Sequence, residues 1–142
     1  MARILLVDDY PDALEVWSLY LRMCGFEVVT AADGMSALAA ALHHPPDIAI
    51  LDLEMPGLSG YELARRLRAD PATRAVPLMA VSGHSQPSRI EEAHNAGFDR
   101  VLTKPCDPDR LCFEIQQLLG GSAEIAGVPP AALNRQGSTH RR

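Results

Sequence analysis

The chain has 142 residues, of which 47% are hydrophobic and 22% are charged, as in soluble globular domains with a buried core. Its net charge of −5 argues against binding nucleic acid through a basic face. A signal peptide is not recognisable, and no apolar run approaches the roughly 20 residues that span a bilayer. We therefore expect a cytoplasmic protein that is not bound to a membrane.

Short aliphatic segments recur five times along the chain. They lie at about 3–7, 26–30, 47–52, 76–81 and 98–103. Most of them lack polar alternation, which is typical of strands that are covered on both faces. The segment around Val28 and Val29 is the weakest, and we expect it nearer an edge of the sheet.

Helical segments are predicted in the gaps between these strands. Ser59 with Glu62 three residues later has the spacing of a capping box, and Asp107-Pro108 is an N-cap followed by proline at the first helical position. The predicted helices span 11–24, 34–43, Ser59 to just before Asp70, about Ser85 to Gly97, and Asp107 to Gly120.

The alternation of strands and helices predicts an α/β fold with helices on both faces of a parallel sheet. A flavodoxin-like, doubly wound sheet of five strands in the order 2-1-3-4-5 fits best, because ligands bind such sheets beyond the carboxyl ends of the strands. This folded body is expected over residues 1–120. Residues 121–142 are dominated by Gly, Pro, Ser, Asn and Gln and are expected to form a flexible tail.

Acidic side chains follow two of the predicted strands. Asp8 and Asp9 come directly after the first, and Asp52 ends the third. Carboxylates held this close repel one another unless a cation is present, and oxygen ligands beside a phosphoryl group favour Mg2+. The alternatives are that Asp8 and Asp9 only favour a helix dipole and that Asp52 is a turn residue before Pro56.

Lys104 and Ser82 follow two further strands. A lysine at the end of a buried strand can act as a point charge for phosphate, and a hydroxyl can donate to a phosphoryl oxygen. A surface lysine and a turn serine are the alternatives. Cys24, Cys106 and Cys112 lack metal-ligand spacing, and we expect them to be reduced thiols.

These residues, in this order, resemble the receiver domain of two-component response regulators over about residues 1–120. The resemblance is carried by Asp8-Asp9, by Asp52 with Met55-Pro56-Gly57, by Ser82 and by Lys104-Pro105. It implies that Asp52 is the phosphoacceptor, that Lys104 pairs with the phosphoryl group and that Ser82 turns toward it on activation. It also implies Mg2+ contacts from the side chains of Asp9 and Asp52 and the backbone carbonyl of Glu54, with Asp8 acting largely through water.

Two positions depart from the family pattern. Val101 stands where the family often has Tyr, Phe or His, and Cys106 where it often has Phe, Ile or Val. Val101 is short and restricted at χ1, so we expect output that does not use an aromatic rotamer switch. The segments 97–99 and 106–109 are most similar to receivers that stand alone or belong to hybrid kinases.

The resulting expectation is a single-domain receiver that is phosphorylated by a histidine kinase or a histidine phosphotransfer protein. It would signal through a downstream protein target, since a tail of 22 residues cannot form a DNA-binding domain, and it would not be an enzyme for outside substrates. The main alternative is a receiver-fold adaptor that works without phosphorylation, which Val101 supports. A metal-dependent phosphohydrolase and a flavin-binding protein fit less well, because the sequence shows neither an extra acid-base residue nor a phosphate loop after the first strand.

Overall fold

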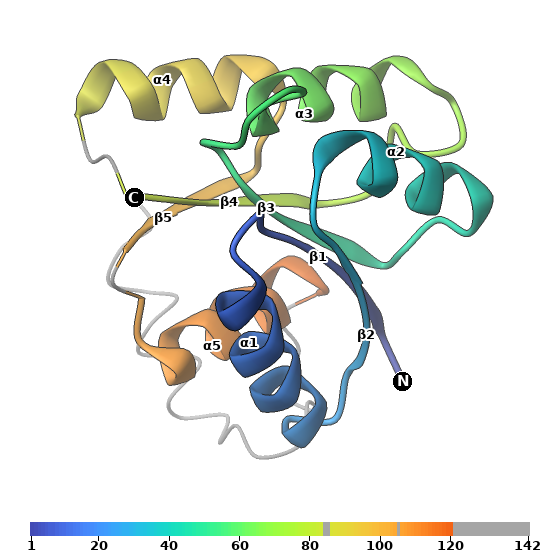
Figure 1. Cartoon of the computed structure of the whole chain (residues 1–142), viewed down its shortest axis with the longest axis vertical. Helices are drawn as coiled ribbons and strands as arrows, with labels where there is room; N and C mark the ends of the chain where they lie inside the picture. The colour runs from blue at the N-terminus through green and yellow to red at the C-terminus, as the bar shows by residue number, and fades with distance from the viewer. Residues whose placement is uncertain (84–85, 105, 121–142) are drawn as a thin grey trace.

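The structure, a computed structural model, describes residues 1–83, 86–104 and 106–120. Within these residues, five parallel strands form one sheet in the order β2-β1-β3-β4-β5, so the predicted fold and strand order are confirmed (Figure 1). The strands are β1 (Arg3–Val7), β2 (Glu27–Ala31), β3 (Ile48–Asp52), β4 (Leu78–Ser82) and β5 (Arg100–Thr103).

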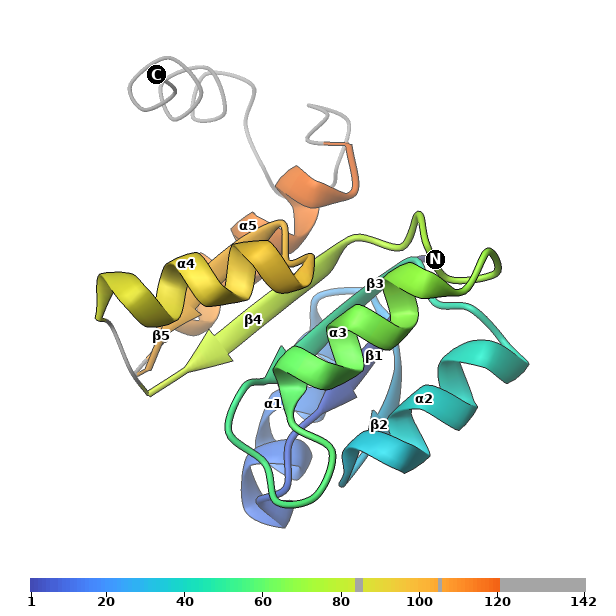
Figure 2. The same ribbon diagram turned by 90° about the horizontal axis from the view of Figure 1, so that it is seen from above.

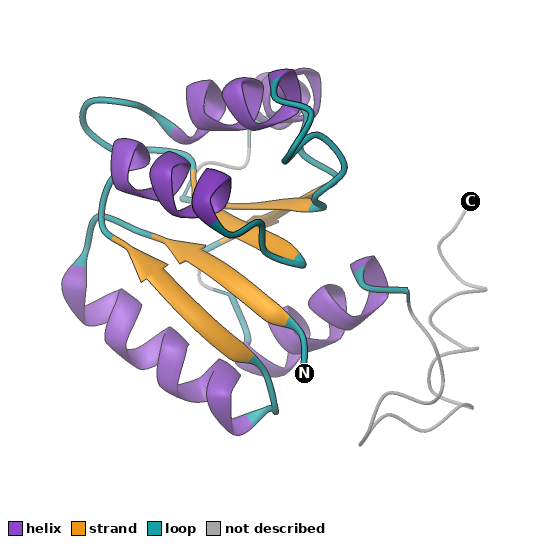
Figure 3. Ribbon diagram, turned by 90° about the vertical axis from the view of Figure 1, so that its right-hand side faces the viewer, coloured by secondary structure: helices purple, strands orange, loops and turns teal. Residues whose placement is uncertain are grey.

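Helices cover both faces of the sheet. The first and last lie on one face and the other three on the opposite face, as Figures 1 and 2 show from two directions. Figure 3 shows the same layers from the side, with the sheet between the helices. The helices are α1 (Pro11–Met23), α2 (Gly34–His43), α3 (Gly60–Ala69), α4 (Pro87–Ala96) and α5 (Pro108–Leu118).

Local signals in the sequence explain where several of these helices begin. The Ser59 side chain accepts a hydrogen bond from the Glu62 amide at 3.2 Å, as the capping spacing predicts. Asp107 caps α5 and is followed by Pro108. Helix α4 begins at Pro87, two residues later than predicted, and Ser85 lies outside the described residues.

Two hydrophobic clusters, one on each face of the sheet, form the core. All five residues of β3 are buried, because this strand lies in the middle of the sheet with helices above and below it. Strand β2 lies at an edge, where Val28 is buried and Val29 is exposed, which confirms the expectation for this segment.

Two other expectations concern the chain as a whole. The tail predicted over 121–142 lies outside the described residues, so it stays a prediction. Among the residues that the structure describes, none of the helices has the length and apolar character needed to cross a membrane.

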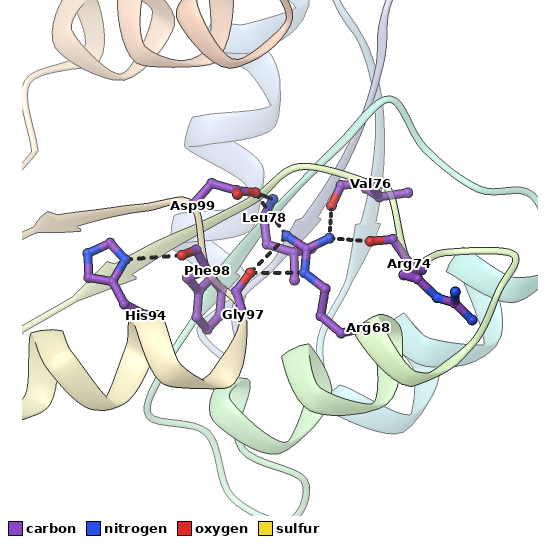
Figure 4. A network of polar contacts seen from close by, with 8 residues as sticks. All are labelled: Arg68, Arg74, Val76, Leu78, His94, Gly97, Phe98 and Asp99. Carbon is purple, nitrogen blue, oxygen red and sulfur yellow. Dashed lines mark hydrogen bonds and ion pairs between the residues drawn. The ribbon is translucent and has the colours of Figure 1, made fainter.

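Arg68 holds together the segments that lead into the amino ends of β4 and β5 (Figure 4). We call this set of contacts the Arg68 clamp. Its guanidinium donates to the carbonyl oxygen of Gly97 at 2.8 and 3.0 Å, to those of Arg74 and Val76 at 2.6 Å each, and to Asp99 Oδ2 at 2.9 Å. Gly97 takes a φ of +116°, and a Cβ there would lie 2.7 Å from Arg68 Cγ. One side chain thus joins the end of α3 to the segments that enter β4 and β5.

Substitution of Arg68 tests this clamp. We expect Arg68→Ala to lower the free energy of unfolding by about 2–4 kcal/mol, because several carbonyl groups lose their donor at once. The matched control is Arg66→Ala on the same helix, whose half-exposed side chain contacts Glu62 at 3.9 Å. Its effect should stay within about 0.5 kcal/mol. Urea unfolding gives both values, and equal losses in the two variants would contradict the clamp.

Candidate functional site

The register of the sheet brings the polar residues at the carboxyl ends of four strands together. Val7 pairs with Leu51, Asp52 with Val81, and Ser82 with Thr103. The residues that follow these pairs therefore leave the sheet at nearly the same level. The Lys104 amide also donates to the Ser82 carbonyl at 2.7 Å, which holds the end of β5 against the end of β4.

Three carboxylates meet at this edge. One oxygen from each of Asp8, Asp9 and Asp52 lies within 4.8 Å of the others, so the structure brings the predicted acidic cluster together. Backbone amides orient two of these groups: Tyr10 donates to Asp8 Oδ1 at 2.9 Å, and Glu54 donates to Asp52 Oδ1 at 3.2 Å. Octahedral Mg2+ with oxygen ligands at about 2.1 Å places opposite ligands about 4.2 Å apart, so the cluster fits this ion with small adjustments.

Lys104 supplies the positive charge of the site. Its Nζ lies 3.6 Å from Asp52 Oδ2 and 3.9 Å from Asp8 Oδ2. The lysine side chain is 43% exposed, whereas that of Asp52 is 7% exposed, so the amine can turn toward an incoming group while the carboxylate stays in place. The predicted approach of Lys104 to the acidic cluster is therefore present.

Burial dominates the titration of Asp52. It raises the pKa of this carboxyl from 3.8 to about 6, and the negative charge of Asp8 adds to the rise, while Lys104 and the Glu54 amide oppose it. A carboxyl with a pKa near 6 is mostly ionised at neutral pH. Asp52 can therefore act as a nucleophile at neutral pH, although its buried charge lowers the free energy of unfolding.

Ser82 lies close to the site, but its hydroxyl is directed to Glu54. It donates to Glu54 Oε2 at 3.1 Å and Oε1 at 3.3 Å. Arg89, in the first turn of α4, pairs with the same Glu54 carboxylate at 3.8 Å. Sequence reasoning considered only the backbone of Glu54 and missed Arg89, because no local pattern indicates which side chains meet across a loop.

Gly60 allows α3 to start directly on the backbone of the site. Its amide donates to the Leu53 carbonyl at 3.1 Å. A Cβ at this position would overlap the carbonyl oxygen of Asp52 and would lie 2.8 Å from the Cα of Leu53. No other residue could begin α3 so close to β3 without moving one of them.

A cavity of about 300 Å³ lies beside Asp52 and Lys104. Its polar end is formed by Asp8, Asp52 and Lys104, and its remaining walls are mostly apolar. These walls come from the sheet, α1, α5 and the segment before α5: Leu6, Val7, Ala13, Trp17, Ile50, Val81, Cys106 and Leu111. The charged groups of the site therefore line one end of this cavity.

The chain matches the family described as "Response regulator receiver domain" over residues 4–116, and it belongs to that family. Protein PilH of Pseudomonas aeruginosa is 35% identical over 121 residues, which cover 85% of this chain and 100% of PilH. Several other relatives are DNA-binding or transcriptional regulators, and the chain spans only about half the length of these proteins.

Solved structures of the same family are close to this fold. The chemotaxis protein CheY4 of Vibrio cholerae has a TM-score of 0.80 and 32% identity, covering 83% of this chain and 98% of that protein. The receiver domain of the sensor histidine kinase PA1611 of P. aeruginosa has a TM-score of 0.79 and 32% identity, covering 84% and 98%. That structure is described as having a magnesium ion coordinated in its active site cleft.

The raised pKa of Asp52 predicts how stability depends on pH. The folded protein holds this proton more tightly than the unfolded chain, so the stability present below about pH 4 is lost as the pH rises through about 6. Asp52→Asn removes this loss, and we expect it to raise the free energy of unfolding by about 2–3 kcal/mol at about pH 8 in EDTA, with little gain near pH 4. Urea unfolding at several pH values measures both.

A variant that removes an exposed charge provides the control. Glu91 is exposed on α4, and Glu91→Gln should leave the pH dependence unchanged. Mg2+ should raise the melting temperature of the wild type more than that of Asp52→Asn, because it binds the folded cluster. A variant at Asp52 that is less stable than the wild type at about pH 8 would contradict the electrostatic account.

Proposed function

We propose that residues 1–120 form a receiver that accepts a phosphoryl group on the Asp52 carboxylate from a histidine kinase or a histidine phosphotransfer protein. The observation that supports it most directly is a buried carboxylate with an amine at 3.6 Å and two further carboxylates beside it. Output would pass through contacts with a downstream protein in the cytoplasm. The chain itself would catalyse only its own phosphorylation and slow dephosphorylation.

The proposed reaction transfers one phosphoryl group between two side chains. An ionised oxygen of Asp52 attacks phosphorus, the P–O bond forms as the P–N bond to the donor imidazole breaks, and the imidazole keeps the electron pair. Lys104 lies where it can balance the charge of the transferred group. Asp8, Asp9, Asp52 and the Glu54 carbonyl would hold Mg2+, which neutralises phosphoryl oxygens when bound.

Ser82 would change its partner after phosphorylation. Its hydroxyl donates to Glu54 in this structure, and a phosphoryl group on Asp52 would offer a more strongly charged acceptor. Transfer of this hydrogen bond would leave the Glu54 carboxylate with Arg89, 3.8 Å away. The state of Asp52 would thereby be reported to the first turn of α4.

The outer face of α1 would be the docking surface for the phosphodonor. Val16, Leu19 and Met23 recur at three- and four-residue intervals and are 64%, 60% and 75% exposed. Helix α1 begins three residues after Asp8, so this apolar stripe runs along the helix away from the site, with Val16 nearest to it. A phosphodonor that presents an apolar helix to it could bring its histidine near Asp52.

An adaptor that works without phosphorylation is the alternative. Val101 favours it, since this β-branched residue is half-buried and packs against the core and cannot swing a ring between two positions. The approach of Lys104 to Asp52 argues against it, because an adaptor has no need to keep these charges together. Phosphorylation itself distinguishes the two functions.

Labelling with acetyl phosphate tests the phosphoacceptor. With Mg2+, we expect the intact mass of the wild type to rise by about 80 Da, the mass of one phosphoryl group, and we expect no rise with EDTA or in Asp52→Asn. The matched control is Asp47→Asn at the opposite end of the same strand, where Asp47 accepts from the Arg3 amide. This variant should label like the wild type. Equal labelling of Asp52→Asn would refute the assignment.

The contact between Ser82 and Glu54 predicts a spectroscopic response. Adding beryllofluoride with Mg2+ should shift the amide signals of residues 52–60 and of the first turn of α4 more than those around Val101 and in α5. Glu54→Gln should reduce the α4 part of this response, because the charge that pairs with Arg89 is absent. Glu62→Gln, at an exposed glutamate on α3, is the control. Shifts that spread through 98–112 as strongly as at the site would contradict this route.

A further inference from the structure

Helices α1 and α5 lie on the same face of the sheet (Figure 1) and share one hydrophobic cluster. Each follows a strand of the same parallel sheet and leaves it from the carboxyl edge, so the two helices run in the same direction. The Tyr20 hydroxyl on α1 donates to Asp109 Oδ1 on α5 at 2.7 Å. This bond shows which turns of the two helices lie opposite each other.

About one turn further along, Cys24 directly follows α1 and Cys112 lies in α5. Cys24 is four residues after Tyr20, and Cys112 is three residues after Asp109. At about 1.5 Å per residue, these steps are about 6 and 4.5 Å along the helices, so the two thiols lie at similar levels. Each cysteine also lies on the same side as its neighbour in the Tyr20–Asp109 bond, because residues three or four apart share one face of a helix. The two cysteines therefore face each other across α1 and α5.

The surroundings of Cys112 keep its thiol protonated at neutral pH. Burial is the main cause that raises the pKa of Cys112 to about 12, and the nearby Cys24 adds to the rise. Both cysteines are only partly buried, so a small oxidant can reach them.

We propose that Cys24 and Cys112 are an oxidation site at which a hydroperoxide forms an intramolecular disulfide between α1 and α5. The bridge would give the domain a second input, separate from phosphorylation. This inference does not depend on the phosphoacceptor function.

The chemistry balances with hydrogen peroxide as the oxidant. The Cys24 sulfur attacks one peroxide oxygen, the O–O bond breaks, and the products are a sulfenic acid and water. The Cys112 sulfur then attacks the Cys24 sulfur, releasing a second water as its own proton is lost. Two thiols lose two electrons and two hydrogen atoms in total, and the peroxide is reduced to two waters. A thiol reductant would reverse the bridge, as expected in a reducing compartment.

Cys106 provides an internal comparison. It lies before α5 beside the cavity of the phosphoacceptor site, and its thiol is 3.7 Å from the Asp107 carbonyl. Burial raises its pKa as well. It is not a member of the pair, so we expect it to stay outside the disulfide.

Peptide mapping of the whole chain tests the proposal. The reduced protein is treated with hydrogen peroxide, remaining thiols are alkylated, and the product is digested with trypsin without reduction. Cleavage at arginines puts the three cysteines on separate peptides, namely 23–65, 101–110 and 111–135. We expect 23–65 to be joined to 111–135, and 101–110 to be alkylated. A link that includes 101–110, a link between two chains, or three free thiols would overturn the proposal.

Variants distinguish a specific bridge from general oxidation. Cys24→Ser and Cys112→Ser should each abolish the linked peptides, whereas Cys106→Ser should keep them. Oxidation should also raise the melting temperature of the wild type and of Cys106→Ser, because the bridge restricts the unfolded chain over the 87 residues between the two cysteines. It should not raise that of the other two variants. An equal rise in all four proteins, or none in the wild type, would count against a bridge between α1 and α5.

Discussion

The position of one charged group, Asp52, constrains the rest of this structure. Asp52 ends a strand whose five residues are all buried, and its carboxylate has little access to water to stabilise its charge. The opposing charge comes from Lys104, which follows β5, two strands away in the sheet. The parallel sheet in this order brings the ends of β1, β3 and β5 close enough for these groups to interact. The strand order, the bond from Lys104 to the Ser82 carbonyl and the family's chemistry are therefore linked.

The amino and carboxyl ends of the strands are held by different kinds of contact. At the amino edge, Arg68 satisfies several carbonyl groups at once and fixes the segments that enter β4 and β5. At the carboxyl edge, Lys104 and Glu54 have partly exposed side chains, and Ser82 has a partner that it could exchange. A local change at Asp52 would therefore act on partly exposed contacts at the carboxyl ends of the strands, far from the Arg68 contacts at their amino ends.

Sequence reasoning succeeded where the signal is repeated or local. The all-aliphatic runs predicted buried strands, and the spacing of Ser59 and Glu62 predicted the cap of α3, because both follow from backbone geometry. The acidic cluster followed from the ends of parallel strands. The contacts of Arg68 and of Arg89 with Glu54, and the placement of Cys24 and Cys112 on facing sides of α1 and α5, were not predictable. Most of these residues lie far apart along the chain. Which of them meet depends on how the helices are placed on the sheet and on side-chain rotamers, and a periodic pattern of hydrophobic residues indicates neither.

The close contact between the start of α3 and the end of β3 has a mechanical consequence. Because Gly60 has no side chain between the helix and the Asp52 peptide, there is no compressible layer there to absorb a displacement. A small shift of that peptide would move the start of α3 by a similar distance, because the two backbones are in direct contact. Helix α3 packs between α2 and α4, so the movement would be felt on the face of the domain opposite α1 and α5. This route for transmitting a signal requires only backbone contact, and it does not require an aromatic side chain at position 101.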